Sequence, residues 1–487
     1  MESSTLSSQR AIILILMGMV LLPFLLVRLF IFHVPFLPTA GYTELPLSPS
    51  SSSPPPMLKT AVVVSRDEQI EQTSAPNGDL VEKQTVHKED KEEASKLDKY
   101  HHVQAEEESA GKYTKDTSGN TLDDQRRKQI GIDEGIQLIN FSVGGCNIWK
   151  GKWIRHRSPP AYTNITCKFI QGHQDCLKNG RPDLQYLHWR WKPHDCELPL
   201  FDAKEFLKLV HGKAWAFVGD SIARNHFQSI LCFLAQVESP EVLSRDDRDL
   251  FVRWFFPAHD FTLAVFWSPF LIEWTENDVE GLPSGSQKLH LDVVDKKWAS
   301  LIHDYDYVVL SGGQWYMKPS IYFIKNEIVG CHYLPGSNFT QLGFFYGLQT
   351  ALRTVYNYIL SSSYNGAVFF RTFTPAHFEN GQWQDGGNCM RTTPTHNATL
   401  GGVTMEMYNI QLKEFGRALQ YSKSGSNFKI VDTIHASLVR ADGHPGPYRF
   451  VGATRNEMPQ DCLHWCLPGT LGVPCSWRCC GTCRKME

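Results

Sequence analysis

The fold is decided by the stretch Phe217-Val218-Gly219-Asp220-Ser221-Ile222-Ala223-Arg224-Asn225, in which an apolar run meets a glycine and then a helix-compatible run. This pattern predicts a buried strand, a tight turn and a helix. A serine at the start of that helix lies where backbone N–H groups and the helix dipole can stabilise an oxyanion. The same residues also fit an ordinary helix cap, formed by Asp220 or Ser221. Ser221 is therefore a candidate nucleophile that needs a base and a carboxylate from elsewhere in the chain.

The same pattern recurs after residue 198. Apolar runs lead into Ser311-Gly312-Gly313, Arg371-Thr372 and Asp432, while residues 344–360 and 405–421 carry apolar side chains at helical spacing. Strands that alternate with helices predict an α/β fold, with a mainly parallel sheet covered on both faces. Reactive residues gather at the carboxyl ends of such strands, which is where these polar residues stand.

Two Asp/His pairs near the C-terminus are candidates for the carboxylate and the base. Asp461 and His464 are three residues apart, so both side chains can project from one side of a turn, whereas the spacing of Asp442 and His444 is less favourable. A purely structural role for His464 is the alternative. We predict no metal site, because no set of histidines and carboxylates has suitable spacing and the cysteines fit disulfides better.

The N-terminal part of the chain predicts a membrane anchor and a spacer. Residues 11–34 form an apolar run long enough for one bilayer crossing, preceded by a cytoplasmic tail of residues 1–10. A signal peptide cleaved near Ala40 is the alternative. Residues 35–140 combine a Ser/Pro run with dense charge and few aromatics, which is typical of a disordered stem.

Cysteines and glycosylation acceptors indicate that the rest of the chain faces an oxidising lumen. All 13 cysteines follow residue 145. Acceptor sequences for glycosylation begin at Asn140, Asn164, Asn338 and Asn397. A formal net charge of −3 argues against nucleic acid as a partner.

Eight of the cysteines form an even set that fits four disulfides, with a pairing that the sequence does not reveal and with Cys331 left over: Cys146, Cys167, Cys176, Cys196, Cys232, Cys389, Cys462 and Cys466. Four of them fall within residues 144–198, together with Trp149, Trp153, Trp189 and Trp191. This segment predicts a disulfide-stapled flap of loops. Its aromatics offer a second interpretation, a surface that binds sugar.

Longer motifs make a resemblance specific. The Gly219-Asp220-Ser221 and Asp461-Cys462-Leu463-His464 motifs resemble the GDSL/SGNH hydrolase superfamily, and their surroundings resemble one branch, the plant trichome birefringence-like family of polysaccharide O-acetyltransferases. The resemblance covers about residues 144–474 and is carried by these matching residues: Gly180-Arg181-Pro182-Asp183, Trp189-Arg190-Trp191-Lys192-Pro193, Gly219-Asp220-Ser221 with Arg224-Asn225, Arg440-Ala441-Asp442-Gly443-His444-Pro445, and Asp461-Cys462-Leu463-His464-Trp465-Cys466-Leu467-Pro468-Gly469.

The resemblance implies an SGNH-like three-layer fold over residues 199–474, after the Cys/Trp-rich subdomain of residues 144–198. The tail of residues 475–487 departs from the family's usual ending and carries four more cysteines. A metal site in this tail is the less favoured reading, because the cysteine spacing fits poorly.

The resemblance also implies a function: a single-pass type II protein of the Golgi membrane whose luminal domain transfers acetyl groups to a cell-wall polysaccharide. Residues 253–270 look most like members that act on xyloglucan, while xylan and mannan stay open as acceptors. The expected partners are the polysaccharide, the Golgi membrane and an acetyl donor, for which acetyl-CoA is one candidate source. No bound cofactor is expected. The alternatives are a polysaccharide acetyl-esterase and a non-catalytic protein that binds wall polysaccharide.

Site roles follow from the same resemblance. Ser221 would be the nucleophile, His464 the base and Asp461 the group that orients the imidazole. The backbone N–H groups of Ser221 and Gly313 are candidates for the oxyanion hole, with the side chains of Asn225 and Arg371 as further candidates. For both side chains, structural hydrogen bonding is the alternative.

Overall fold

The computed structural model describes residues 136–469, except positions 138, 140 and 144 and the segments 277–285, 396–397, 423–427, 453–454 and 456–457. The expected membrane anchor, nearly all of the expected stem, the tail of residues 475–487, Asn140 and Asn397 therefore lie outside the described residues. Within the described part of the chain, no helix is both long enough and apolar enough to cross a membrane.

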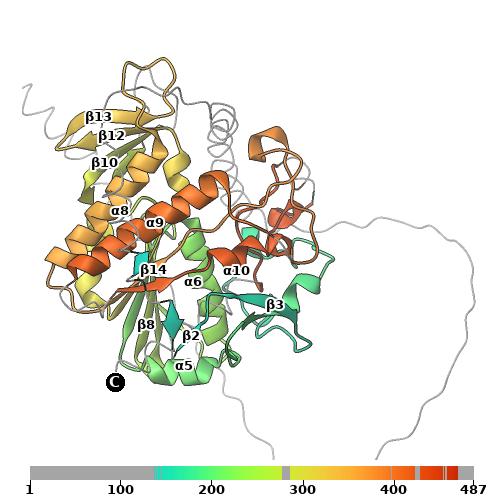
Figure 1. Ribbon diagram of the computed structural model, residues 1–487. Coiled ribbons are helices and arrows are strands. Elements are labelled where there is room, and N and C mark those ends of the chain that lie inside the picture. The colour runs from blue at the N-terminus through green and yellow to red at the C-terminus, as the bar shows by residue number, and fades with distance from the viewer. Residues whose placement is uncertain are drawn as a thin grey trace, which may run out of the picture. The chain divides into compact units, whose positions relative to one another are not determined.

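A seven-stranded sheet forms the centre of the fold (Figure 1). Its strands lie in the order β15 (Phe428–Val431), β14 (Ala367–Arg371), β11 (Tyr307–Ser311), β5 (Ala214–Gly219), β8 (Phe261–Trp267), β7 (Phe251–Phe256) and β6 (Glu241–Arg245). The first five are parallel, whereas β7 and β6 pair antiparallel at one edge. The predicted α/β class is confirmed, but the sheet is mixed. Short antiparallel edge strands carry no signal that distinguishes them from parallel ones.

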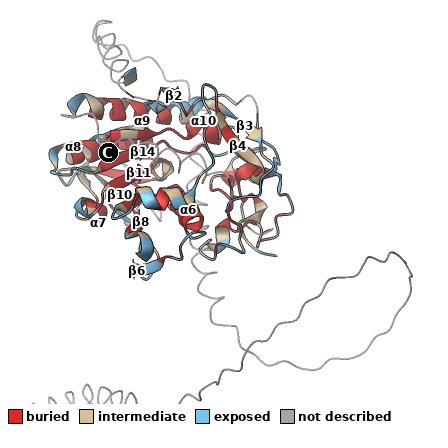
Figure 2. Cartoon of the chain, turned by 90° about the horizontal axis from the view of Figure 1, so that it is seen from below, coloured by how far each residue is buried: buried red, intermediate tan, exposed pale blue. Residues whose placement is uncertain are grey.

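Helices cover both faces of this sheet and make three layers. Helices α5 (Ala203–Leu209) and α6 (Ser221–Leu234) share a core cluster with one face of β5 and β8, and α8 (Gly343–Ser361) and α9 (Gly402–Tyr421) share a second cluster with the other face. Figure 2 shows the buried residues concentrated in the sheet, while the edge strand β6 is exposed along its whole length. Burial on both faces explains why β5 reads as an unbroken apolar run.

A second sheet of four strands was not predicted from the sequence. Its order is β13 (Glu327–His332), β12 (Ser320–Ile324), β10 (Gln287–Val294) and β9 (Ile272–Glu276), and α8 packs against β10. Two short antiparallel pairs lie outside the sheets, β1 (Ser142–Val143) with β2 (Cys146–Asn147), and β3 (Gly151–Arg155) with β4 (Trp189–Pro193). The remaining elements are short helices: α7 (Lys296–Ala299), α10 (Ile434–Leu438), η1 (Gly172–Gln174), η2 (Gln185–Leu187), η3 (Pro257–His259), η4 (Ile302–Asp304), η5 (Gln314–Met317), η6 (Trp383–Asp385), η7 (Ala441–Gly443) and η8 (Pro447–Arg449).

The eight predicted cysteines form four disulfides, and Cys331 is buried without one. The bridges are Cys146–Cys196, Cys167–Cys232, Cys176–Cys466 and Cys389–Cys462. Only the first closes within the Cys/Trp-rich segment; the second reaches α6, and the third reaches the loop that follows His464. The segment is therefore stapled to itself by one bridge, as expected, and to the rest of the domain by two others. Its own apolar side chains are too few for a separate core, so Trp153 and Trp191 pack against Ala436, and Tyr162 packs against Phe233.

Candidate active site

The turn between β5 and α6 requires glycine at position 219. Ser311 of the neighbouring strand β11 pairs with Gly219, and a Cβ atom at position 219 would lie 1.9 Å from the carbonyl oxygen of Ser311. No other residue permits this approach without moving backbone. Asp220 then caps α6, because its carboxylate accepts from the amides of Ile222 at 3.0 Å and Ala223 at 3.3 Å. The cap interpretation thus applies to Asp220 and leaves the Ser221 hydroxyl available.

Ser221, His464 and Asp461 form one hydrogen-bonded chain. The Ser221 Oγ lies 2.7 Å from Nε2 of His464, and Nδ1 of His464 lies 2.9 Å and 3.2 Å from the two carboxylate oxygens of Asp461. Asp461 also accepts from the amides of Leu463 at 3.1 Å and His464 at 2.9 Å. These amide bonds fold the loop into a turn, so the i,i+3 spacing brings both side chains to one side as expected.

The electrostatics of the chain assign the protons. Burial alone would raise the pKa of Asp461, but the charges of His464 and Arg449, and the hydrogen bonds from the side chain and the amide of His464, hold it well below its usual range. An ionised carboxylate only accepts hydrogen bonds, so Nδ1 of His464 carries the proton. Nε2 is then free to accept from the Ser221 hydroxyl. This is the arrangement in which a histidine acts as a base toward serine.

The second Asp/His pair, Asp442 and His444, supports the loop that carries His464. Asp442 forms an ion pair with Arg440 at 2.7 Å, not with a histidine. His444 donates from Nδ1 to the backbone oxygen of His464 at 2.6 Å and stacks on Trp465 with ring centroids 4.4 Å apart. Burial lowers the pKa of His444 well below its usual 6.5, so its ring supports the loop of His464 as a neutral group.

The oxyanion-hole candidates are two backbone amides, those of Ser221 and Gly313, and two side chains, those of Arg371 and Asn225. Gly313 follows β11 and precedes η5, at the carboxyl edge of the sheet where Ser221 follows β5. Arg371 is fully buried and donates to the backbone oxygen of Thr372 at 3.2 Å and to Oγ1 of Thr374 at 2.8 Å. These hydrogen bonds hold the chain that follows β14, which fits the structural alternative for Arg371. The roles of the Ser221 and Gly313 amides remain predictions.

Asn225 clamps α6 to the loop that carries His464. Its side-chain oxygen accepts from the amide of Trp465 at 2.8 Å, and its nitrogen donates to the carbonyl of Trp465 at 3.2 Å. Asn225 stands one turn after Ser221 on α6, and Trp465 directly follows His464. The geometry therefore favours a positioning role over direct contact with an oxyanion, because both ends of the amide are engaged by backbone.

Replacing Asn225 by alanine is expected to lower kcat by about 10- to 100-fold with little change in KM, because the Ser221–His464 distance loses its clamp. It also leaves two buried backbone groups of Trp465 unpaired, which costs about 1–3 kcal/mol of stability. Steady-state kinetics and thermal unfolding of the full chain measure both. Asn225→Asp keeps the acceptor and loses the donor, so its kcat and its stability should lie between those of the wild type and of Asn225→Ala. An unchanged kcat in a folded alanine variant would show that the clamp does not position the pair.

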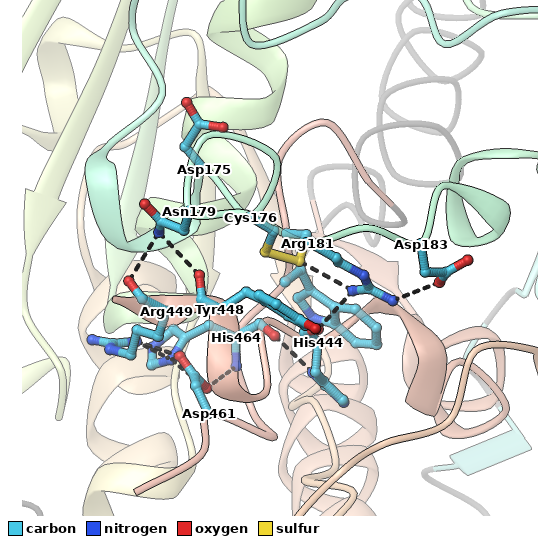
Figure 3. Close-up of a disulfide and its surroundings, with 12 residues drawn as sticks. Asp175, Cys176, Asn179, Arg181, Asp183, His444, Tyr448, Arg449, Asp461 and His464 are labelled. Carbon is cyan, nitrogen blue, oxygen red and sulfur yellow. Dashed lines mark hydrogen bonds and ion pairs between the residues drawn. A yellow bond between two sulfur atoms is a disulfide. The ribbon is translucent and has the colours of Figure 1, made fainter. Parts of the chain in front are cut away.

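The Cys/Trp-rich segment supports the loops around His464 (Figure 3). Asn179 donates to the carbonyls of Tyr448 at 3.0 Å and Arg449 at 3.1 Å, and Arg181 donates to those of Asp442 at 2.7 Å and His444 at 2.8 Å. The disulfide Cys176–Cys466 anchors the chain two residues beyond His464. The segment is thus part of the site's scaffold.

Sequence reasoning missed Arg449. Its guanidinium contacts the carboxylate of Asp461 and lies 3.2 Å from Nδ1 of His464. No spacing or composition signal marks an arginine that meets these residues only through a loop. Asn179, in contrast, stands beside the quoted Gly180-Arg181-Pro182-Asp183 motif, which was a usable signal.

The remaining predicted sites are described only in part. Asn338 is exposed and Asn164 is partly exposed, so both are accessible positions, and glycosylation there stays a prediction. Across the described ranges, no three His, Cys, Asp or Glu side chains are grouped as a metal site would require.

Two family models match the chain between residues 144 and 477. The PC-Esterase family model, described as a GDSL/SGNH-like acyl-esterase family found in Pmr5 and Cas1p, matches residues 198–477, and the PMR5 N-terminal domain model matches residues 144–197. Protein trichome birefringence-like 25 of Arabidopsis thaliana is 45% identical over 372 residues, which cover 73% of this chain and 81% of the relative.

Two further relatives carry an activity in their names. Xyloglucan O-acetyltransferase 1 of Populus trichocarpa is 40% identical over 339 residues, covering 67% of this chain and 78% of the relative. Xyloglucan O-acetyltransferase 4 of the same species is 40% identical over 348 residues, covering 70% of this chain and 82% of the relative.

Proposed function

Since the chain belongs to the PC-Esterase family, and within it to the trichome birefringence-like proteins, we propose that it is an O-acetyltransferase that acetylates a plant cell-wall polysaccharide through Ser221. The observation that carries the proposal is the hydrogen-bonded chain from the Ser221 hydroxyl through His464 to Asp461. A serine with a base on one side and a helix N-terminus on the other is equipped for acyl transfer.

The first half-reaction forms an acetyl-serine. Nε2 of His464 takes the hydroxyl proton as Ser221 Oγ bonds to the acetyl carbon of the donor, and the imidazolium then returns that proton to the leaving group. Asp461 holds the imidazole in the required tautomer and stabilises its charged form. The first amides of α6 and that of Gly313 are the proposed donors to the oxyanion.

The second half-reaction passes the acetyl group to sugar. A sugar hydroxyl gives its proton to His464 as its oxygen attacks the acetyl carbon, and the bond to Ser221 Oγ breaks as the serine regains a proton. The acetyl donor is needed in stoichiometric amount, and acetyl-CoA is one candidate for its source.

Aromatic side chains near the nucleophile support a sugar acceptor. Trp267 ends β8 and pairs in register with Gly219, two residues before Ser221. Trp315 meets it at 5.2 Å between ring centroids, and the guanidinium of Arg224 lies 4.8 Å over the Trp267 ring. Trp267 is buried and Trp315 is partly exposed, so Trp315 is the ring of this pair that is able to contact a pyranose. Xyloglucan is the favoured acceptor because two relatives bear that name; xylan and mannan are the others.

We further propose that the catalytic domain faces the Golgi lumen and is held by residues 11–34 as a single-pass type II anchor. Four disulfides among the described cysteines support an oxidising compartment. The exposed glycosylation acceptor Asn338 fits the same side of the membrane.

The test is acetyl transfer by the full chain. It is incubated with acetyl-CoA in one arm and with an activated aryl acetate in another, together with xyloglucan, xylan or mannan oligosaccharides, and each sugar is followed by mass. Acetyl gain on one class of oligosaccharide is the expected result. Loss of acetyl groups from acetylated oligosaccharides with no gain in any arm would replace the proposal by an acetyl-esterase.

A further inference from the structure

The guanidinium of Arg449 lies against the acid and the base of the site together. Its Nη1 donates to Oδ2 of Asp461, the same oxygen that faces Nδ1 of His464 at 2.9 Å. That nitrogen is also 3.2 Å from Nδ1 of His464 (Figure 3). Since Nδ1 carries a proton, two donors converge on one carboxylate oxygen. The Arg449 side chain is only 10% exposed, so solvent screens this contact weakly.

The position of Arg449 is set by the fold around it. Arg449 is the last residue of η8, whose carbonyls at positions 448 and 449 accept from the Asn179 side chain. Asp461 is tied to Gly446, just before η8, by a pair of backbone hydrogen bonds of 2.8 Å and 3.0 Å. These bonds use main-chain atoms, so they survive replacement of the Arg449 side chain.

A fixed cation in this place acts against the imidazolium form of His464. Asp461 stabilises that form, whereas Arg449 repels it and shares the carboxylate oxygen that would otherwise serve His464 alone. Because both groups are shielded, the repulsion is felt more strongly than between exposed side chains. Without Arg449, only Asp461 of these two groups would act on the charge of His464, and it favours the imidazolium, which cannot accept a proton from Ser221.

The other titratable groups that face His464 come from different elements. Asp220 caps α6; burial raises its pKa, which the Ala223 amide and the charge of Arg371 oppose. His444 contacts the backbone of His464; burial and then His377 lower its pKa. Arg449 itself contacts Asp461 and His464, so its replacement is expected to act on that pair.

We propose that Arg449 is a positioning residue that holds the Asp461 carboxylate beside His464 and opposes the imidazolium form of that base. This deepens the proposed function, since it rests on Ser221 as nucleophile and His464 as its base. Arg449 stays outside the reacting atoms.

The test measures the base without using a sugar. A fluorophosphonate labels an activated serine: a bond forms between Ser221 Oγ and phosphorus, fluoride leaves, and the serine proton passes through His464. The labelling rate of the full chain is measured from acid to alkaline pH for the wild type, R449Q, R449K and R455Q. Arg455 is the matched control, because its guanidinium lies 5.2 Å over the ring of Tyr448 on the same loop.

In R449Q the midpoint of the acid limb is expected to move up by about one pH unit or more, so that labelling is lost in acid and kept near neutrality. R449K, which keeps the charge, and R455Q should hold the wild-type midpoint more closely. Thermal unfolding checks that each variant is folded, and R449M, which also removes the charge, replaces R449Q if the latter is not.

Labelling that falls equally at every pH in R449Q and R449M, with the midpoint in place, would overturn the inference. So would an equal shift in R455Q. These outcomes are distinct from failure of the proposed function, which would appear as normal labelling of Ser221 in a wild-type chain that adds no acetyl group to any oligosaccharide.

Discussion

Replacing Ser221 by alanine is expected to lower acetyl transfer by at least about 10³-fold, because the proposed acetyl-serine intermediate can no longer form. Ser221 is partly exposed and its hydroxyl bonds to His464, so removing the hydroxyl leaves the core intact. The measurement is acetyl gain on the best oligosaccharide under saturating donor, with thermal unfolding alongside.

The matched control is Ser229→Ala on the same helix. Ser229 is buried and shares a hydrogen bond of 3.1 Å with Tyr162, away from His464. Its loss should cost about 1 kcal/mol of stability and leave transfer within a few-fold of the wild type. Acetyl gain that persists undiminished in Ser221→Ala would remove Ser221 as the nucleophile.

Asp461→Asn is expected to lower kcat by about 10³- to 10⁴-fold, the scale that loss of the orienting carboxylate has in serine triads. An asparagine amide lets the imidazole adopt the wrong tautomer and cannot stabilise its charged form. The change also leaves the charge of Arg449 without its carboxylate, in a place that is only 10% exposed. Single-turnover acetylation of Ser221, followed by intact mass, separates this chemical step from binding.

Asp442→Asn supplies the contrast, since it changes the other Asp/His pair in the same way. Asp442 and Arg440 are both almost fully buried, so breaking their ion pair should cost several kcal/mol of unfolding free energy. The folded fraction should still acetylate Ser221. If Asp442→Asn slowed that step as severely as Asp461→Asn in folded protein, the assignment of the two pairs would be wrong.

The features that the sequence predicted well are local ones. A buried strand, a glycine turn and a helix start are encoded within nine residues, and the strand–helix alternation repeats that pattern along the chain. The i,i+3 spacing of Asp461 and His464 is also local, and backbone amides close that turn as expected. The eight paired cysteines could be counted, although counting does not reveal which of them meet.

The tertiary structure decided everything that depends on chain segments far apart in sequence. The Ser221–His464 bond joins residues 243 positions apart, and the clamp from Asn225 to Trp465 spans 240. Asn225 could be read from the sequence as an oxyanion donor, because spacing along the chain does not tell which backbone an amide will meet. The second sheet and the antiparallel edge strands were not predicted for the same reason, since strand pairing joins segments that are far apart in the sequence.

Arg449 is the clearest example of a site residue that sequence patterns do not predict. By itself the sequence determined a serine at a strand–helix turn, a closely spaced Asp/His pair, an α/β domain and an even set of cysteines, because periodicity, turn chemistry and short spacings act between neighbours in the chain. Only the folded chain brought a cation to the shared carboxylate of that pair and bridged Cys176 to Cys466 beside it. Such contacts arise from packing between loops, where no periodic pattern records which residues will meet.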